Sequence, residues 1–394
     1  MGRFEQAVIL AAGEGQRLRP FTAFKPKVMI TIAGKPMVQY VIEALAANGV
    51  RRIAMVVGYR KEQVLDFLGA GEMFGVEIGY VTQPHQLGTA HALKQARDMV
   101  GDEFLVLSGD NIIEPDTIAR FVESKPDSIL IKRQEDVSKY GVVTVREGLV
   151  TDIVEKPKGA EDNLVNTGIY AFNQEIFDFI GEEVDLTAVL KNMTLRGRPL
   201  AAEETSSTWL DVVYPWDILK LNGWALGKIS SSSGGIVERG VTTKGPVRVG
   251  KSTVIRSGSY IVGPAVIGES CEIGPSVFIA PSTTIGDNVI VFPFTEIRNS
   301  VIGNSVEIGS GSSVTDSIID HGCVIKGRFV ARSGEAEVRI DGEHHSLQMG
   351  AMLGEGCNID EGVIVKPGVI IGNHCHIAAM RVVREKPPDG SLVV

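Results

Sequence analysis

Residues 249–291 read VGKSTVIRSGSYIVGPAVIGESCEIGPSVFIAPSTTIGDNVIV, and this stretch decides the fold of the second half of the chain. A β-branched apolar residue recurs at every sixth position. The uninterrupted series is Val249, Ile255, Ile261, Ile267, Ile273, Ile279, Ile285, Val291 and Ile297. An amphipathic helix repeats every 3.6 residues and a single strand every two, so neither gives this period. The pattern predicts a hexapeptide-repeat, left-handed parallel β-helix.

The repeat continues toward the C-terminus with small shifts of register. It slips by one residue at Ile302, slips again at Ile319, and resumes at Leu353. All four cysteines fall four residues after an apolar position of the repeat, namely Cys271, Cys323, Cys357 and Cys375. We therefore expect them to act as small buried hydrophobic residues, not as metal or redox sites. Residues 327–350 break the period and are predicted to form an arm that leaves the coil.

The first half of the chain has a different pattern of apolar residues. Short apolar runs such as residues 7–10 and 104–107 alternate with amphipathic stretches, which predicts an α/β domain with a Rossmann-like, mostly parallel sheet. A serine- and glycine-rich stretch separates the two halves. The predicted organisation is a first domain over residues 1–227, a linker over 228–240, and the β-helix over 241–394 with its arm at 327–350.

The composition excludes some classes of partner. The 394 residues carry a formal net charge of −9, which disfavours attraction to nucleic acid or to an anionic membrane. The N-terminus lacks the apolar core of a signal peptide and no apolar run is long enough to span a membrane, so we expect a cytoplasmic protein. Any phosphate ligand must therefore bind at a local basic cluster.

Such a cluster follows the first predicted strand. Gly13 and Gly15 come directly after it, where bare backbone can approach a ligand and offer N–H groups to phosphate oxygens. Four cations follow within eleven residues: Arg17, Arg19, Lys25 and Lys27. An ordinary strand-to-helix turn would explain the glycines but not the cations. The stretch is predicted to bind phosphate.

A carboxylate stands at a second strand end. Asp110 follows the apolar run 104–107 and a glycine, where it could ligate a hard cation. Mg²⁺ in proteins is typically held by one or two carboxylates together with substrate phosphates. An N-cap for a following helix is the alternative interpretation of the same pattern.

These motifs, with others further on, resemble the sugar-1-phosphate nucleotidylyltransferases. The resemblance covers the whole first domain, and the β-helix extends it to two-domain members related to N-acetylglucosamine-1-phosphate uridyltransferase. The stretches that carry it are LAAGEGQRLRP and KPK, Gln83 to Ala90, LSGD, Tyr140-Gly141-Val142, Glu155-Lys156-Pro157, Asn166-Thr167-Gly168 and Trp209-Leu210-Asp211. It implies a Mg²⁺-dependent enzyme that makes a nucleotide sugar and pyrophosphate from a nucleoside triphosphate and a sugar 1-phosphate.

The resemblance assigns roles to particular residues. The catalytic residues would be Arg17, Lys27 and Asp110. The nucleotide would be bound by Leu10, Ala11, Gly13, Gly15, Gln83, Gly88 and Thr89. The sugar pocket would be lined by Gly141, Glu155, Lys156, Asn166 and Thr167. The metal ligands would be Asp110 and Asp211, with Asp217 and Asn222 as alternatives for the second. Gln16 departs from the family, which usually has Thr or Ser there. Because a backbone phosphate cradle needs no hydroxyl, we expect activity to survive with altered triphosphate contacts.

The sequence restricts the choice of nucleoside triphosphate but not that of sugar 1-phosphate. The stretch from Gln83 to Ala90 resembles the N-acetylglucosamine uridyl enzymes more than the guanylyl ones, which implies UTP or dTTP as the nucleotide in preference to GTP. Glucose 1-phosphate and N-acetylglucosamine 1-phosphate both stay open as the sugar. A single hydrogen bond to a substituent can decide between such sugars.

The β-helix is predicted to assemble a homo-oligomer, with a trimer favoured. Related two-domain enzymes also use it for amino-sugar-phosphate acetylation, with a histidine base. In this chain the matching positions carry Ser310 and Ser313, and Ala331 to Gly334 replaces an asparagine-containing stretch. The histidines of this half that could act as a base instead are His321, His344, His345, His374 and His376. A bifunctional enzyme and a non-catalytic regulatory subunit remain the alternatives.

Overall fold

The computed structural model describes residues 3–155 and 163–394, which divide into two compact units. The first unit holds residues up to Gly15, Phe24–Ile30 and Pro36–Val213. The second holds Gln16–Ala23, Thr31–Lys35 and Tyr214–Val394. Two short segments of the N-terminal part thus belong to the second unit, which a division at residue 227 did not foresee.

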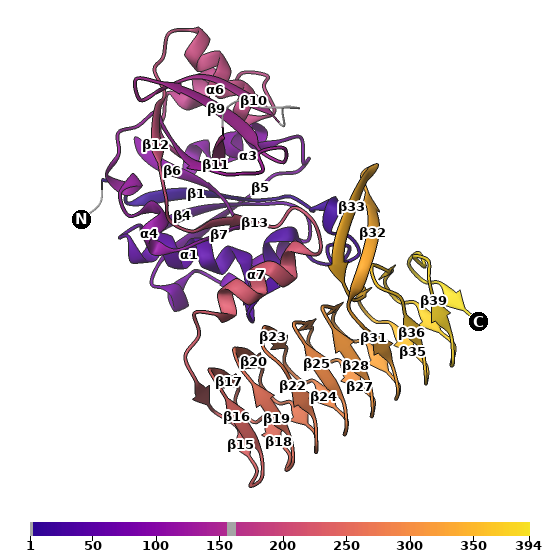
Figure 1. The fold of residues 1–394 in the computed structure, drawn as a ribbon. Helices are drawn as coiled ribbons and strands as arrows, with labels where there is room; N and C mark the ends of the chain where they lie inside the picture. The colour runs from indigo at the N-terminus through magenta and orange to yellow at the C-terminus, as the bar shows by residue number, and fades with distance from the viewer. Residues whose placement is uncertain (1–2, 156–162) are drawn as a thin grey trace. The chain divides into compact units, whose positions relative to one another are not determined.

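A nine-stranded sheet forms the centre of the first unit, in the order β5-β4-β1-β6-β11-β8-β12-β10-β9 (Figure 1). Its strands are β1 (Gln6–Ala11), β4 (Arg52–Val57), β5 (Glu77–Thr82), β6 (Glu103–Ser108), β8 (Ser128–Arg133), β9 (Gly141–Arg146), β10 (Leu149–Glu155), β11 (Leu164–Asn173) and β12 (Ala201–Glu204). Shorter strands are β2 (Thr31–Ile32), β3 (Lys35–Pro36), β7 (Asn111–Ile113) and β13 (Trp209–Asp211).

The Rossmann-like prediction is confirmed, but the sheet is parallel only in part. Strands β5, β4, β1 and β6 run parallel, whereas β11 pairs antiparallel with both β6 and β8. Strands β9 and β10 also pair antiparallel, across the two residues Glu147 and Gly148. Both residues have positive φ, as a tight hairpin turn requires. So short a connection cannot make the crossover that a parallel pair needs.

Helices cover both faces of this sheet. The described helices are α1 (Met37–Ala47), α2 (Lys61–Leu68), α3 (Thr89–Gln95), α4 (Pro115–Ile118), α5 (Ile176–Ile180), α6 (Leu186–Leu195) and, in the second unit, α7 (Asp217–Leu226). Alternate residues of β1 point to opposite faces, so Ile9 packs with α1 in one core and Val8 with α3 and α6 in the other. Burial on both faces explains why these strands are continuously apolar.

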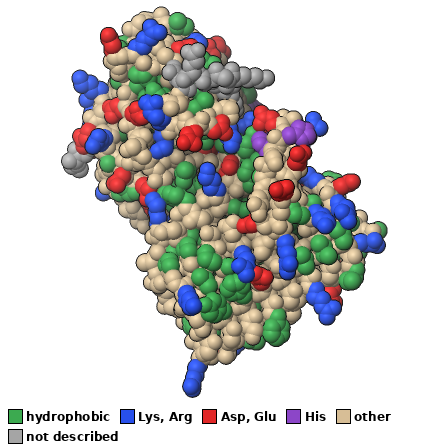
Figure 2. Space-filling view, in the orientation of Figure 1, with side chains coloured by type: hydrophobic (Ala, Val, Ile, Leu, Met, Phe, Trp, Pro, Cys, Tyr) green, Lys and Arg blue, Asp and Glu red, His purple; other side chains and the backbone are tan. Residues whose placement is uncertain are grey.

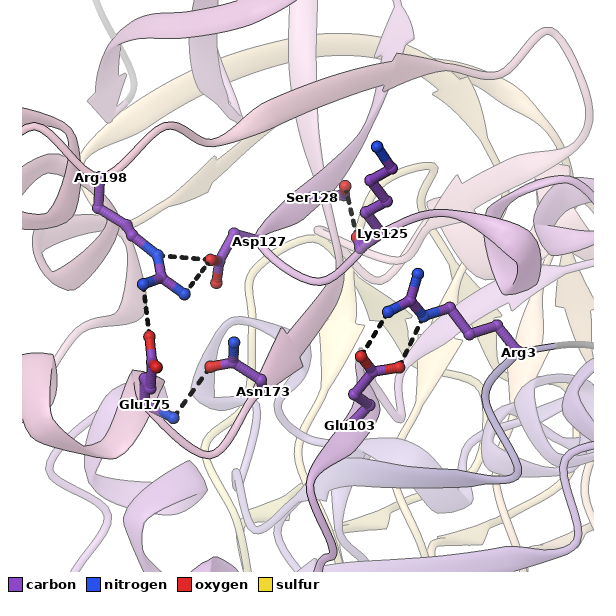
Figure 3. A network of polar contacts seen from close by, with 8 residues as sticks. All are labelled: Arg3, Glu103, Lys125, Asp127, Ser128, Asn173, Glu175 and Arg198. Atoms are coloured by element: carbon purple, nitrogen blue, oxygen red, sulfur yellow. Dashed lines mark hydrogen bonds and ion pairs between the residues drawn. The ribbon is translucent and has the colours of Figure 1, made fainter.

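Ion pairs join the ends of several elements of the first unit (Figure 3). The guanidinium of Arg3 donates to both carboxylate oxygens of Glu103, at 2.6 and 2.5 Å. Arg198 pairs with Asp127 at 2.6 Å and also with Glu175. The Arg3–Glu103 pair is partly exposed, so its contribution to stability is small. None of the residues in these two clusters lines the cavity where β1, β5 and β6 end.

The second unit contains a parallel β-helix of three sheets. The first sheet has β14 (Ser232–Ser233), β17 (Val247–Val249), β20 (Ala265–Ile267), β23 (Thr283–Ile285), β26 (Val301–Ile302), β29 (Ile318–Ile319), β34 (Met352–Leu353) and β37 (Ile370–Ile371). The second has β15 (Ile236–Val237), β18 (Val254–Ile255), β21 (Glu272–Ile273), β24 (Ile290–Val291), β27 (Glu307–Ile308), β30 (Val324–Ile325), β35 (Asn358–Ile359), β38 (His376–Ile377) and β40 (Leu392–Val393). The third has β16 (Thr242–Lys244), β19 (Tyr260–Val262), β22 (Phe278–Ile279), β25 (Glu296–Arg298), β28 (Ser313–Thr315), β31 (Val330–Ala331), β36 (Ile364–Val365) and β39 (Val382–Val383).

The hexapeptide repeat maps directly onto these sheets. Ile267 pairs with Ile285 one coil further on, and Ile285 pairs with Ile302, so the predicted slip is a coil shortened by one residue. The repeated apolar residues form one continuous core inside the coils. All four cysteines are 3% exposed or less and belong to that core, which confirms that they are buried thiols.

Two predicted boundaries need correction. Strands β14 and β15 already pair with the coils that follow, so the first coil begins inside the segment 228–240 that was predicted to be a linker. An outermost coil has a neighbour on one side only, and Ser232 and Ser233 there interrupt the hexad pattern. The arm is also shorter than 327–350, because Val330 and Ala331 still pair within the coil. It is a hairpin of β32 (Gly334–Ile340) and β33 (Glu343–Met349).

The hairpin packs against residues that precede α7 in the second unit. The ring of His345 lies 4.4 Å from that of Tyr214 and 5.0 Å from that of Trp216. The Tyr214 hydroxyl donates to Glu343 at 2.8 Å, and burial together with this carboxylate raises the pKa of Tyr214 to about 12. His345 therefore has a packing role, which disfavours it as a catalytic base. No helix in the described part of the chain is long and apolar enough to cross a membrane.

Candidate active site

A cavity of about 350 Å³ opens in the first unit, where β1, β5 and β6 end. In open α/β sheets, this is the edge at which ligands bind. The cavity is lined by Leu10, Ala11, Ala12, Gly13, Lys27, Val28, Gln83, Gln86, Gly88, Thr89, Ala92, Ser108, Asp110 and Asp185. Residues from three separate sequence motifs therefore meet in one place.

The glycines of the loop after β1 have different roles. A Cβ built on Gly13 would meet no atom within 4 Å, although the residue lines the cavity. Nothing among the described residues requires a glycine here for lack of space, and the missing side chain suits close approach by a ligand. A Cβ on Gly15 would lie 2.8 Å from Cβ of Lys27, and its φ is +79°. Because Gly15 has no side chain, the Lys27 side chain can pack against its backbone.

Lys27 lies between two carboxylates. Its Nζ is 2.6 Å from Asp110 and 3.2 Å from Asp211. Only 17% of the lysine side chain is exposed, against 26% for Asp110 and 20% for Asp211. Burial alone would lower the pKa of Lys27, but the two carboxylates outweigh it and raise this pKa above its ordinary value. The ammonium group is therefore charged at neutral pH.

Backbone pairing brings the two carboxylates together. Asp110 follows β6, and β7 begins at the next residue. Strand β13 pairs antiparallel with β7 so that Asp211 lies opposite Asn111. A Cβ on Gly109 would lie 3.0 Å from Ile9 and 3.2 Å from the carbonyl oxygen of Leu10, so glycine lets this turn approach β1.

The structure favours Asp211 over the alternative metal ligands. Asp217 accepts a hydrogen bond from the backbone N–H of Tyr214 at 2.7 Å, at the start of α7. Asn222 is fully buried and bonds to Ala33, Ser282 and Thr284. Both belong to the second unit and hold its elements together. No cluster of three or more His, Cys, Asp or Glu suited to a metal occurs among the described residues, so substrate phosphates would have to complete a metal's coordination.

The predicted nucleobase residues Gln83, Gly88 and Thr89 all line this cavity. Gln83 is 4% exposed, and its Nε2 lies 3.0 Å from the carbonyl oxygen of Gly88. A Cβ on Gly88 would lie 2.4 Å from the carbonyl oxygen of Val184, so only glycine fits there. The Thr89 hydroxyl accepts the backbone N–H of Leu186 at 2.9 Å. Gly88 and Thr89 therefore fix the loop as well as line the cavity.

The predicted sugar residues fall into three groups. Gly141, Glu155 and Asn166 lie together, because a Cβ on Gly141 would be 3.2 Å from Glu155 and 3.7 Å from Asn166. The side chain of Thr167 is placed differently from these three. Its hydroxyl donates to the carbonyl oxygen of Leu130 at 2.6 Å, and the residue is 1% exposed, so its side chain faces the core. Lys156 lies outside the described residues.

The backbone of Thr167 instead supports the strands that place the two carboxylates. Its carbonyl oxygen accepts hydrogen bonds from Asn111 Nδ2 at 3.1 Å and from Trp209 Nε1 at 2.9 Å. These two residues belong to β7 and β13, the strands that place Asp110 and Asp211. The motif around Thr167 is thus a positioning element for the carboxylates.

Arg17 has a different environment from Lys27. It lies in a short 3₁₀ helix (Gln16–Leu18) of the second unit, and its Nε is 2.8 Å from Asp341 at the tip of the hairpin. Both side chains are about half exposed, at 44% and 58%. Arg17 is not among the residues that line the cavity.

Several lining residues were not predicted. Asp185 precedes α6, and one of its carboxylate oxygens would lie 2.7 Å from a Cβ on Gly88. In the sequence it reads as an ordinary N-cap, and no local signal links it to residue 88. Ser108 and Gln86 stand inside motifs that were noticed, so their motif position was the available signal.

The fold and cavity define the class: an α/β domain with a lysine and two carboxylates at its sheet edge, followed in the chain by a parallel β-helix. The family model described as nucleotidyl transferase matches residues 6–223, and that described as GMPPB C-terminal domain matches residues 261–341. The chain belongs to the nucleotidyl transferase family.

Its relatives match over nearly the whole length. The "Bifunctional protein GlmU" of Methanocaldococcus jannaschii is 32% identical over 392 residues, covering 95% of this chain and 93% of the relative. A "Bifunctional sugar-1-phosphate nucleotidylyltransferase/acetyltransferase" of Sulfurisphaera tokodaii is 31% identical, covering 94% and 95%. A Bacillus anthracis crystal structure described as a glucose-1-phosphate thymidylyltransferase aligns with 29% identity and a TM-score of 0.53, over 58% of this chain and 97% of that one.

Proposed function

We propose that this enzyme transfers a nucleotidyl group from UTP or dTTP to glucose 1-phosphate or N-acetylglucosamine 1-phosphate and releases pyrophosphate. Its relatives and structural neighbours are sugar-1-phosphate nucleotidyltransferases, and the chain is an enzyme of that kind. The observation that carries the proposal is the placement of Lys27 between Asp110 and Asp211, in a cavity that Gly13 leaves open.

The residues support a mechanism of positioning and charge neutralisation. The sugar phosphate oxygen attacks the α-phosphorus of the triphosphate in line, and the bond to the departing pyrophosphate breaks. Lys27 offsets the negative charge of the two phosphates as they meet, in a partly buried place where a fixed cation has a large effect. The backbone around Gly13 holds the triphosphate, and Gly141, Glu155 and Asn166 hold the sugar.

A divalent metal ion is the expected cofactor, because enzymes of this family act with one. We propose Mg²⁺, held by Asp110 and Asp211 together with phosphate oxygens. These two carboxylates already converge on a cation, the ammonium group of Lys27, so they suit a second one. When bound, the metal supplies Lewis-acid polarisation of the phosphate.

The assignment of substrates is tested by pyrophosphate release over a matrix of four triphosphates and four sugar 1-phosphates. We expect turnover with UTP or dTTP and with glucose or N-acetylglucosamine 1-phosphate. Release with no combination, in the presence of divalent metal, would contradict the proposal.

Replacing Gly13 by alanine is expected to leave the fold intact and weaken triphosphate binding. The added methyl group meets no atom of the chain but occupies ligand space. We expect kcat/KM for the triphosphate to fall by about 10²-fold with an unchanged melting temperature, the size of effect seen when a substrate is displaced by about 1 Å. Unchanged kinetics would show that the ligand does not approach this glycine.

Replacing Arg17 by alanine is expected to lower kcat on the order of 10²–10³-fold, because the family resemblance assigns its guanidinium to the triphosphate as one preorganised donor. The matched control is Asp341→Ala, which removes the same ion pair but keeps the guanidinium. Steady-state kinetics of both variants separate the two roles of Arg17. An equal loss in both would mean that the ion pair matters and the triphosphate contact does not.

The β-helix serves assembly in this proposal. Large apolar side chains are exposed on the coils, and Figure 2 shows hydrophobic side chains gathered on their visible face. They include Phe292, Phe294, Ile364, Met380 and Val382. We propose that copies of the chain, three by preference, cover these surfaces in a homo-oligomer.

Acetyl transfer is the second candidate function, because relatives over the full length are named bifunctional. The coils carry a hollow lined by Ser310, Lys326, Arg328, Asp360 and Glu361, and the adjacent His376 bonds to Asp360 at 3.0 Å. Ser310 supplies no base where the family resemblance expects a histidine. We therefore favour an enzyme without this activity. Product formed from acetyl-CoA and glucosamine 1-phosphate would establish the second function.

A further inference from the structure

The side-chain amide of Gln83 is held in one orientation. Gln83 follows β5 and lines the cavity. Its Nε2 lies 3.0 Å from the carbonyl oxygen of Gly88 and 2.9 Å from Nδ1 of His91. A backbone carbonyl can only accept a hydrogen bond, so the atom facing Gly88 must be the amide nitrogen.

This orientation fixes the state of the histidine. The nitrogen of Gln83 has two protons, and the second points to His91 Nδ1, which must therefore accept. In this arrangement the ring proton is on Nε2. The oxygen Oε1 of Gln83 is the side-chain atom left for a ligand in the cavity, and it can only accept.

His91 is itself well placed to hold this bond. It lies in the first turn of α3, is half-buried, and its backbone N–H donates to Val184 at 3.2 Å. Gln95, one turn further along the helix, donates from Nε2 to the His91 carbonyl oxygen at 3.1 Å. The same nitrogen lies 3.5 Å from Nε2 of the ring, but both atoms are donors in this tautomer, so this contact adds no hydrogen bond to the ring.

We propose that His91 is a positioning residue that selects the nucleobase by keeping the oxygen of Gln83 turned toward the nucleotide. The inference rests on the proposed function, in which Gln83 contacts the base. An acceptor at this point favours bases with a ring N–H on the reading edge, namely uracil, thymine and guanine. Cytosine and adenine present a lone pair there, and two facing acceptors leave both unsatisfied.

The experiment compares UTP with CTP in the full-length enzyme. Wild type is expected to prefer UTP on the order of 10²-fold or more in kcat/KM, because a site built for a hydrogen bond rejects a base that cannot make it. His91→Leu removes the acceptor and is expected to reduce the UTP-to-CTP ratio about tenfold, mainly through a higher KM for UTP. His91→Gln offers an acceptor again and should restore part of the ratio.

The control is His85→Leu, the same substitution at an exposed histidine of the same segment. It should leave the ratio unchanged. A ratio that is also unchanged in His91→Leu would overturn the inference. So would an equal loss with both nucleotides that His91→Gln fails to restore, because that pattern indicates a purely structural role.

Binding of UTP and CTP is measured in parallel by calorimetry without sugar phosphate. This separates the two proposals. If no sugar phosphate is turned over but UTP binding is preferred and the preference depends on His91, the proposed reaction fails while the positioning role stands. If wild type binds UTP and CTP equally, the positioning role fails even in an active enzyme.

Discussion

Asp110→Asn is expected to reduce kcat by on the order of 10³-fold or more, even at saturating sugar 1-phosphate. The substitution keeps the size of the side chain but removes the charge that would hold the metal, and metal stabilisation of a phosphoryl transition state is worth several kcal/mol. Asp211→Asn should have a similar effect, since both carboxylates contact the same cation in the cavity. Steady-state pyrophosphate release at varied metal concentration measures it.

The matched control is Asp217→Asn. Asp217 was an alternative ligand in the sequence, but its carboxylate bonds to the backbone of Tyr214 in the second unit. This variant should keep most of the kcat of wild type. If Asp217→Asn were inactive and Asp211→Asn active, the second ligand would be misassigned. An Asp110→Asn enzyme with full activity would remove the metal site altogether.

Lys27→Met is expected to lower kcat on the order of 10²–10³-fold and also to increase metal affinity in the absence of nucleotide. The kinetic loss follows from removal of one fixed cation at the transferred phosphate. The change in metal affinity follows from electrostatics, because Asp110 and Asp211 would face each other without the ammonium group. Methionine keeps the chain length that packs along Gly15.

Thermal unfolding with and without Mg²⁺ or Mn²⁺ measures the second effect. The melting temperature of Lys27→Met should lie below that of wild type without metal, since two carboxylates lose their partner. Added metal should raise it more than it raises that of wild type. An equal response to metal in both proteins would show that the carboxylates do not form the binding site.

Local patterns predicted much of this molecule. The hexapeptide repeat predicted the coils because each repeated isoleucine points into the same core. The spacing of these residues in the sequence follows directly from their packing. The repeat did not predict the first coil, because Ser232 and Ser233 interrupt the hexad pattern there. The antiparallel pairings of the first sheet were missed, because apolar runs do not show the direction of a strand.

In the candidate site, the sequence motifs predicted which residues take part but not which side chains they contact. Asp211 was one of three alternatives until the pairing of β13 with β7 placed it beside Asp110. Thr167 carries a family motif, yet its hydroxyl bonds within the core at Leu130. Asp185 and the contact of His91 with Gln83 depend on how a loop and a helix pack, which no local sequence pattern shows.

A crystal structure with UTP and Mn²⁺ tests the central claim most directly, because the anomalous signal of manganese locates the metal independently of the ligand. We predict an anomalous peak at the carboxylates of Asp110 and Asp211, with the triphosphate along Gly13 and the uracil at Gln83. A peak away from both carboxylates, or a nucleotide bound outside this cavity, would contradict the account.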